Sequence, residues 1–192
     1  MKGLKFNNQF TSELPGDPSD SQAERLISNA LFARVAPKKP ASPYLIHYSP
    51  EVAEEIGLKV SECAGKDFVD LFSGFKIMPG MDPHATCYGG HQFGNWAGQL
   101  GDGRAINLGE IDTEKGHLML QLKGAGPTPF SRNADGFAVL RSSLREYLCS
   151  EAMQHLGIRT TRALSIVGTG EQVMRDFLYD GHPALERGAV VC

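Results

Sequence analysis

The chain is organised around the stretch Tyr88-Gly-Gly-His-Gln-Phe-Gly-Asn-Trp-Ala-Gly-Gln-Leu-Gly-Asp-Gly-Arg104, in which six of seventeen residues are glycine. Glycine lets the backbone approach a ligand closely and adopt positive φ. Successive free N–H groups in such a loop form a concavity that attracts anions. Arg104 ends the stretch, and Lys123 ends the second of two strand-like segments that follow it, so both add fixed positive charge. The stretch therefore predicts a binding site for nucleotide phosphates.

The segment after this stretch predicts an antiparallel hairpin. Residues 104–111 alternate in polarity, residues 112–116 have turn composition, and residues 117–123 place three leucines on one face. By the same alternation, Lys123 lies on the face opposite the leucines.

A loop over residues 124–136 leads into the longest predicted helix, Val139 to Leu156, which Gly157 ends. Helical periodicity predicts that its buried stripe consists of Leu140, Leu144, Tyr147, Leu148 and Ala152. Glu146 falls away from that stripe, whereas Glu151 falls on it.

The remaining segments are predicted to be scaffold. Residues 22–35 favour a helix whose second half is alternatively extended, and short helices are expected over residues 50–57 and 66–72. Residues 160–167 predict a strand, and Gly168-Thr-Gly170 predicts a turn.

Composition narrows the class of protein. With 192 residues, 41% apolar content and a net charge of −3, the chain is suited to a folded core and gives no reason to expect a nucleic-acid or membrane partner. We recognise no signal peptide and no apolar run near the length of about 20 residues that a membrane span needs. The four scattered cysteines favour a reduced, cytoplasmic setting.

The order of these parts is that of the upper lobe of protein kinases: glycine-rich loop, strand pair, strand lysine, long helix with an acid. Adjacent phosphates repel each other, so a cation must lie between them, and a flexible lysine needs a carboxylate to hold it. We therefore expect an α+β fold, a protein-kinase-like upper lobe with a twisted antiparallel sheet plus one long helix, incomplete as a fold. Residues 1–80 would form an N-terminal extension that packs on the lobe, and residues 81–192 the nucleotide-binding lobe.

Spacing alone leaves plainer interpretations open. The glycines do not match a standard kinase loop or a Walker A loop. Lys123 could be a solvated lysine at a sheet end, and Arg104 a charge at the start of a hairpin. Glu146 could be a surface carboxylate, with Glu151 as the rival partner of Lys123. Asp135-Gly136 is also ordinary turn chemistry before a helix.

Two further interpretations concern the glycine-rich region. His84, Cys87 and His91 have spacing that zinc ligands use, but no fourth ligand lies nearby in sequence, so we do not expect a metal there. Trp96 is predicted to anchor the loop against the lobe.

Several strings resemble the selenoprotein O family. They are the opening stretch to Arg104, Leu120-Gln-Leu-Lys-Gly-Ala-Gly126, Leu140-Arg-Ser-Ser-Leu-Arg-Glu-Tyr-Leu-Cys-Ser-Glu-Ala152, Glu13-Leu-Pro-Gly-Asp17 and Thr160-Thr-Arg-Ala-Leu164. The resemblance spans nearly the whole chain. It implies a kinase-like fold, of pseudokinase type, that transfers AMP from ATP to Ser, Thr or Tyr hydroxyls of other proteins, with ATP in the reverse orientation.

The resemblance also assigns individual residues. Lys123 matches the strand lysine and Glu146 its helix partner, and these are the catalytic candidates. The residues assigned to the nucleotide are Gly101, Gly103, Arg104, Lys123, Asp135 and Gly136. The implied cofactors are ATP and Mg²⁺ (or Mn²⁺), and the implied partners are protein hydroxyl acceptors.

The chain departs from the family pattern in two ways. Phe137 occupies a position where an arginine is expected, so a charge is missing beside the implied site. The apolar run at residues 188–192 predicts the opening of a buried strand, and further phosphate-binding arginines, a catalytic-loop acid and the Mg²⁺ ligands are expected beyond Cys192. We therefore expect this fragment alone to be inactive. The rival functions are a kinase-type phosphotransferase and a non-catalytic nucleotide-binding module.

Overall fold

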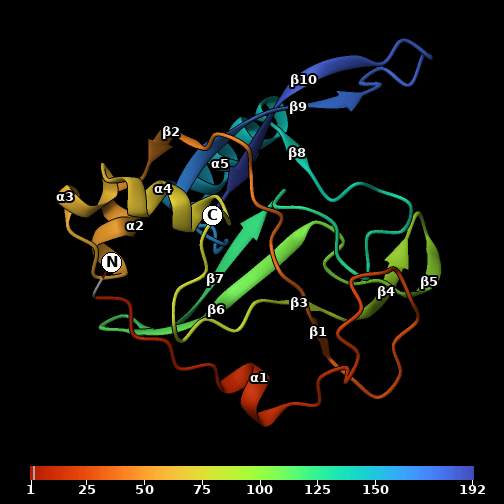
Figure 1. Cartoon of the computed structure of the whole chain (residues 1–192), viewed down its shortest axis with the longest axis horizontal. Helices are drawn as coiled ribbons and strands as arrows, with labels where there is room; N and C mark the ends of the chain where they lie inside the picture. The colour runs from red at the N-terminus through yellow and green to blue at the C-terminus, as the bar shows by residue number, and fades with distance from the viewer. Residues whose placement is uncertain (2) are drawn as a thin grey trace.

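The structure is a computed structural model that describes Met1 and residues 3–192. It has an α+β fold in which most strands belong to one antiparallel sheet (Figure 1). In spatial order the sheet contains β1 (Phe32–Arg34), β3 (His84–Thr86), β6 (Ala105–Thr113), β7 (Gly116–Lys123), β10 (Ala184–Val191), β9 (Ser165–Arg175) and β2 (Tyr44–Tyr48), with β8 (Ala138–Val139) paired to β10.

The helices are short except for the last. They are α1 (Gln9–Glu13), α2 (Pro50–Glu55), α3 (Val60–Cys63), α4 (Lys66–Phe72) and α5 (Leu140–His155). The predicted helices at residues 50–57 and 66–72 are confirmed. Ser49 caps α2 by accepting a hydrogen bond from the Val52 N–H at 3.3 Å, as its position before Pro50 predicts. Among the described residues, none of the helices has the length and apolar content needed to span a bilayer.

The predicted hairpin is confirmed as β6 and β7. Its register pairs Ile106 with Leu122 and Ala105 with Lys123. The predicted alternation holds in β7, where Leu120 and Leu122 are buried while Met119 is exposed. It fails in β6, where residues 105–109 are all buried.

The main core lies between the sheet and helices α2 to α4. Phe68 and Phe72 of α4 are fully buried against Ile106 and Leu122 of the sheet. Strands β1 and β2, from the first 80 residues, pair with β3 and β9 at the two edges of the sheet. The sheet and its core therefore cross the predicted boundary at residue 80, and the division into two parts stays a prediction.

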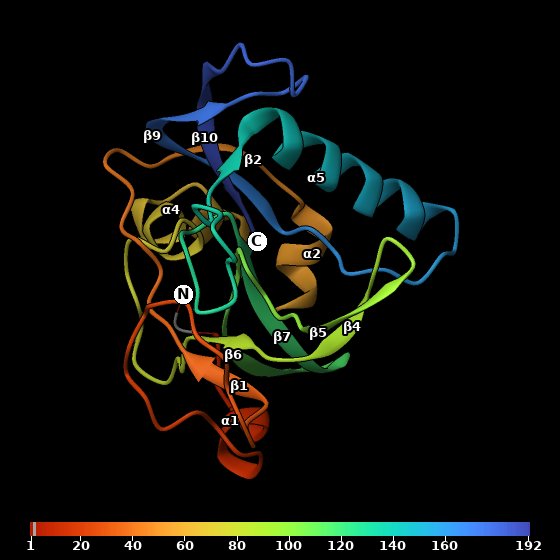
Figure 2. The same ribbon diagram turned by 90° about the vertical axis from the view of Figure 1, so that its right-hand side faces the viewer.

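Helix α5 packs on the opposite face of β9 and β10, as Figure 2 shows from the side. Its predicted bounds are confirmed to within a residue, but its predicted buried stripe is only partly right. Tyr147 is buried and Leu140 packs against the core, whereas Leu148 is 63% exposed and Leu144 and Ala152 are exposed too. The buried residues are Ser143, Tyr147 and Ser150. Small serines let the helix approach the sheet closely, and the Ser150 hydroxyl donates to the Thr161 carbonyl at 2.5 Å.

Other expectations need correction. Residues 22–31 form no helix, whereas the extended alternative is confirmed in β1. Gly168-Thr-Gly170 lies inside β9 and forms no turn. A Cβ on Gly168 would lie 2.3 Å from the Tyr44 ring, so this glycine admits a neighbouring side chain. The β9–β10 hairpin extends beyond the body of the molecule (Figure 1).

The glycine-rich stretch is also more regular than predicted. It forms a separate ribbon of β4 (Gly89–Gln92) and β5 (Asn95–Gln99), which reaches away from the main sheet (Figure 2). Phe93 and Gly94 form its turn with φ of 52° and 81°. The irregular residues that remain, 100–104, lead into β6.

Candidate functional site

Lys123 and Glu146 form an ion pair, with 3.1 Å between Nζ and Oε1. Lys123 is the last residue of β7 and points to the face that α5 covers, because it lies opposite Val191 in the register. Glu146 lies in the second turn of α5. The side chains are 35% and 39% exposed, so a ligand can reach both.

The rival acid is engaged elsewhere. Glu151 accepts two hydrogen bonds from Arg162, at 2.8 and 3.0 Å. Of the two helix carboxylates that the sequence offered, the structure places Glu146 at Lys123. The role of this pair in binding nucleotide stays a prediction.

A hollow of about 410 Å³ lies beside the pair. Lys123 and Glu146 form part of its wall, and most of the exposed lining is apolar. The other contributions come from β7, α2, residues 160–164 and the end of β10. The hollow is large enough for a small-molecule group, and its charged lining residues are Lys123, Glu146, Arg162 and Glu55.

Gly101 and Gly103 are required by close packing. Gly101 has φ of 131°, and a Cβ there would lie 2.5 Å from the Phe130 ring; a Cβ on Gly103 would lie 2.7 Å from the Phe130 carbonyl oxygen. The Ser131 hydroxyl donates to the Gly103 carbonyl at 2.5 Å. The glycine turn is therefore held by the loop that precedes α5, and contact with phosphate stays a prediction for both glycines.

Arg104 lies at the same end of the sheet as Lys123. Its carbonyl accepts a hydrogen bond from the Gly124 N–H at 2.8 Å, so the two strand ends are adjacent. Its side chain is exposed and is not among the lining residues of the hollow. The structure brings the two cationic residues to neighbouring strand ends but does not join them in one pocket.

Asp135 is bound by an arginine that the sequence analysis missed. Arg175, at the end of β9, donates to the two carboxylate oxygens at 2.7 and 2.8 Å. Burial raises the pKa of the Asp135 carboxyl group, but hydrogen bonds from Arg175 and the Phe137 N–H outweigh it and leave the pKa below its ordinary value. No spacing signal could have found Arg175, because 40 residues separate it from Asp135.

Gly136 allows the loop to cross itself. Its φ is 72°, and a Cβ there would lie 2.2 Å from the Gly126 carbonyl carbon. Any side chain would break this crossing. The turn chemistry expected at Asp135-Gly136 is therefore present, and contact with nucleotide stays a prediction for both residues.

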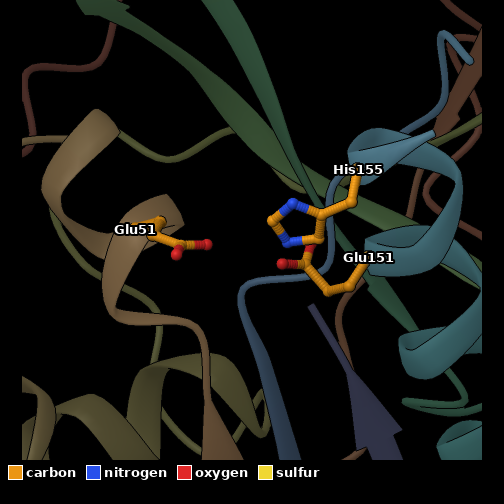
Figure 3. A group of neighbouring side chains, drawn as sticks. All are labelled: Glu51, Glu151 and His155. Atoms are coloured by element: carbon orange, nitrogen blue, oxygen red, sulfur yellow. The ribbon is translucent and has the colours of Figure 1, made fainter. Parts of the chain in front are cut away.

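A second cluster of polar side chains lies between α2 and α5. Glu51, Glu151 and His155 have ligand atoms within 4.8 Å of one another, and Figure 3 shows Glu51 facing the other two. Arg162 already bonds both oxygens of Glu151 and lies 3.7 Å from Glu51. A metal cation would have to displace this guanidinium, so the cluster fits an ion-pair network that ties α2 to α5 better than a metal site.

The weak zinc pattern is not assembled. His84 is buried, with its ring stacked on Phe10 at 5.4 Å between centroids, whereas His91 contacts Trp96 in the ribbon at 5.1 Å. Trp96 is 65% exposed, so the prediction that it anchors the loop against the lobe is wrong. Its ring instead covers Gly89 of the facing strand, where no side chain competes for the space.

Comparison with known proteins gives one family. The family model described as "Protein adenylyltransferase SelO" matches residues 20–192. The chain is 58% identical over 192 residues to the "Protein nucleotidyltransferase YdiU" of Flavobacterium johnsoniae and 59% identical over 197 residues to that of Aromatoleum aromaticum. Both alignments cover the whole chain, which spans 37% and 38% of the relatives' lengths.

Proposed function

Because the chain belongs to the protein adenylyltransferase SelO family, we propose that it is the nucleotide-binding part of an enzyme that transfers AMP from ATP to Ser, Thr or Tyr hydroxyls of other proteins. The resemblance to this family expected from the sequence is confirmed. The observation that carries the proposal is the ion pair between Lys123 and Glu146 beside an accessible hollow.

The proposed architecture is a protein-kinase-like upper lobe with an N-terminal extension. In kinases a glycine-rich loop, a strand lysine and a helix glutamate act together on the phosphates. The same sequence of parts here is β4–β5 with Gly101 and Gly103, then Lys123 on β7, then Glu146 on α5. The proposed extension, residues 1–80, supplies edge strands β1 and β2 on either side of this lobe.

In the proposed reaction, an acceptor hydroxyl oxygen forms a bond to the α-phosphorus of ATP, and the bond from that phosphorus to the pyrophosphate oxygen breaks. The hydroxyl proton passes to the carboxylate of the catalytic-loop acid expected beyond Cys192, and pyrophosphate leaves. Negative charge builds on the phosphate oxygens. The Lys123 ammonium, held by Glu146, and the Arg104 guanidinium stabilise it. The glycine turn allows the backbone to approach the phosphates, and the turn at Asp135 and Gly136 adds a contact.

The proposed cofactors are ATP and Mg²⁺ or Mn²⁺, with the metal ligands in the part of the full-length protein outside these residues. A divalent cation would neutralise phosphate charge. The proposed setting is the cytoplasm, and the proposed acceptors are proteins. The 192 residues alone are expected to bind nucleotide without transferring AMP.

The position of the radiolabel on ATP tests the reaction. We expect full-length protein to label a protein acceptor from ATP labelled at the α-phosphate and not from ATP labelled at the γ-phosphate. Transfer of the γ label would support the kinase-type alternative. Binding of ATP with neither transfer would support a non-catalytic module.

A further inference from the structure

We propose that Arg175 is a positioning residue that holds the loop of residues 124–137 in its nucleotide-binding form. The inference rests on the proposed function, which assigns Asp135 and Gly136 of this loop to the nucleotide. Arg175 is not among the residues assigned to the nucleotide, and it reaches the loop from the end of β9.

The contacts of Arg175 fix both sides of the turn. Its Nη1 and Nη2 donate to Asp135 Oδ2 and Oδ1 at 2.7 and 2.8 Å, and Nη2 also donates to the Phe137 carbonyl at 3.0 Å. A planar guanidinium matches a carboxylate in this two-pronged geometry, which a lysine ammonium cannot reproduce. The Arg175 side chain therefore binds the residues on both sides of Gly136, Asp135 and Phe137.

The loop needs such support because its backbone is strained. Arg132 and Asn133 have φ of 48° and 63°, in the left-handed region that L residues disfavour. Gly136 follows at 72° and passes in direct contact with Gly126. A loop with this backbone relaxes unless the surrounding structure holds it, and Arg175 is the bidentate ion-pair partner that reaches it from the sheet.

Charge gives Arg175 a second effect on the site. A carboxylate repels phosphate, and Asp135 would carry an unpaired negative charge at the nucleotide without its guanidinium partner. Removal of Arg175 therefore both loosens the loop and makes the site less favourable to ATP. Both effects weaken nucleotide binding.

The chain offers a matched control in Arg141. It makes an equivalent two-pronged pair with Glu186 of β10, at 2.9 and 3.0 Å, and so ties the same β9–β10 hairpin to α5. It does not touch the loop of residues 124–137. Loss of Arg141 tests whether attachment of the hairpin in general matters, and loss of Arg175 tests the loop.

The experiment compares full-length wild-type protein with Arg175→Gln, Arg175→Lys and Arg141→Gln. Equilibrium titration gives the Kd for ATP, and the AMP-transfer assay gives KM for ATP and kcat. Hydrogen exchange follows the amides of residues 124–137. We expect Arg175→Gln to weaken ATP binding about tenfold, the scale of lost hydrogen bonds to a charged group. KM should rise with a smaller change in kcat, and exchange in the loop should be faster.

Two controls complete the test. Arg175→Lys should recover only part of the affinity, and Arg141→Gln should leave the Kd within about twofold of wild type, since surface pairs away from a site contribute little. If Arg175→Gln adds no loss of affinity in an Asp135→Asn background, the two residues act as one unit, as expected.

Wild-type affinity and unchanged loop exchange in Arg175→Gln would overturn the inference, as would equal losses in Arg175→Gln and Arg141→Gln. If the wild-type protein bound no ATP, the proposed function itself would fail. The exchange data would then still decide whether Arg175 holds the loop.

Discussion

The ion pair between Lys123 and Glu146 is expected to contribute little to stability. Both side chains are more than one-third exposed, and pairs of this kind contribute about 0–1 kcal/mol because water screens them. The pair between Glu151 and Arg162 is less exposed, at 17% and 15%, and it joins α5 to residues of α2. The two glutamates of one helix are therefore expected to differ in role.

Substitution of each glutamate separates these roles. We expect Glu146→Gln to lower AMP transfer by full-length protein while the free energy of unfolding changes by less than about 1 kcal/mol. We expect Glu151→Gln to destabilise the fold by about 1–3 kcal/mol, because Arg162 loses its charged acceptor. Chemical denaturation and the transfer assay together measure both. Equal effects of the two substitutions on both measurements would show that Glu146 and Glu151 do not differ in role.

His84 gives the fold a dependence on pH. Its ring is buried against Phe10 and Phe32, and no group in the described part of the chain bonds its Nε2. Burial lowers the pKa of His84 below 6.5, although Asp82, Glu110 and Asp102 act in the opposite direction. The unfolded chain therefore binds this proton at a higher pH than the folded chain does.

Stability should consequently fall as pH drops below about 6.5, toward the lowered pKa of the folded state. Substitution His84→Phe keeps the stacking and removes the titrating group, so it should flatten this part of the stability curve. Denaturation at pH values from 5 to 8, in steps of about 0.5, measures the slope; a slope that persists in His84→Phe would assign it to other groups.

At the scale of elements, the sequence predicted where α5 lies but not which way it faces. Helix periodicity reports a stripe of leucines, and the usual inference is that a stripe is buried. Here the serine face packs on the sheet, while Leu148 is exposed. Periodicity in one helix cannot say which face meets the sheet when small residues allow closer packing on the other side. The predicted turn at Gly168 was wrong for a similar reason. A glycine that makes room for the Tyr44 ring cannot be told from a turn glycine by sequence alone.

Two substitutions test which face of α5 packs on the sheet. Ser143 is buried and Leu148 is exposed. We expect Ser143→Leu to destabilise the protein by about 1–3 kcal/mol through overpacking. Leu148→Ser should change stability by no more than about 0.5 kcal/mol, as surface substitutions usually do. The reverse order of effects would mean that the leucine stripe is the buried face after all.

At the scale of the whole molecule, one sheet contains strands from both ends of the chain, whereas β4 and β5 form a separate ribbon. The β6–β7 hairpin was predictable because local alternation encodes it. The order of motifs predicted a helix carboxylate near Lys123, but only the family resemblance chose Glu146 over Glu151. The edge strands β1 and β2 were not, because pairing across long stretches of sequence depends on partners that no local pattern names. The same limit hid Arg175, whose partner Asp135 is close only in the folded chain.

We propose that Lys123, placed by this sheet and held by α5, acts on the phosphates of ATP. The direct measurement is AMP transfer and ATP affinity in full-length protein carrying Lys123→Ala, beside Lys115→Ala as a control. Lys115 also forms an ion pair, with Glu55 at 2.7 Å, but it lies in the turn at the far end of the hairpin. We predict that Lys123→Ala lowers transfer by about 100-fold or more, the scale of a lost oxyanion donor, with Lys115→Ala near wild type. Transfer and affinity at wild-type levels in Lys123→Ala would contradict the account.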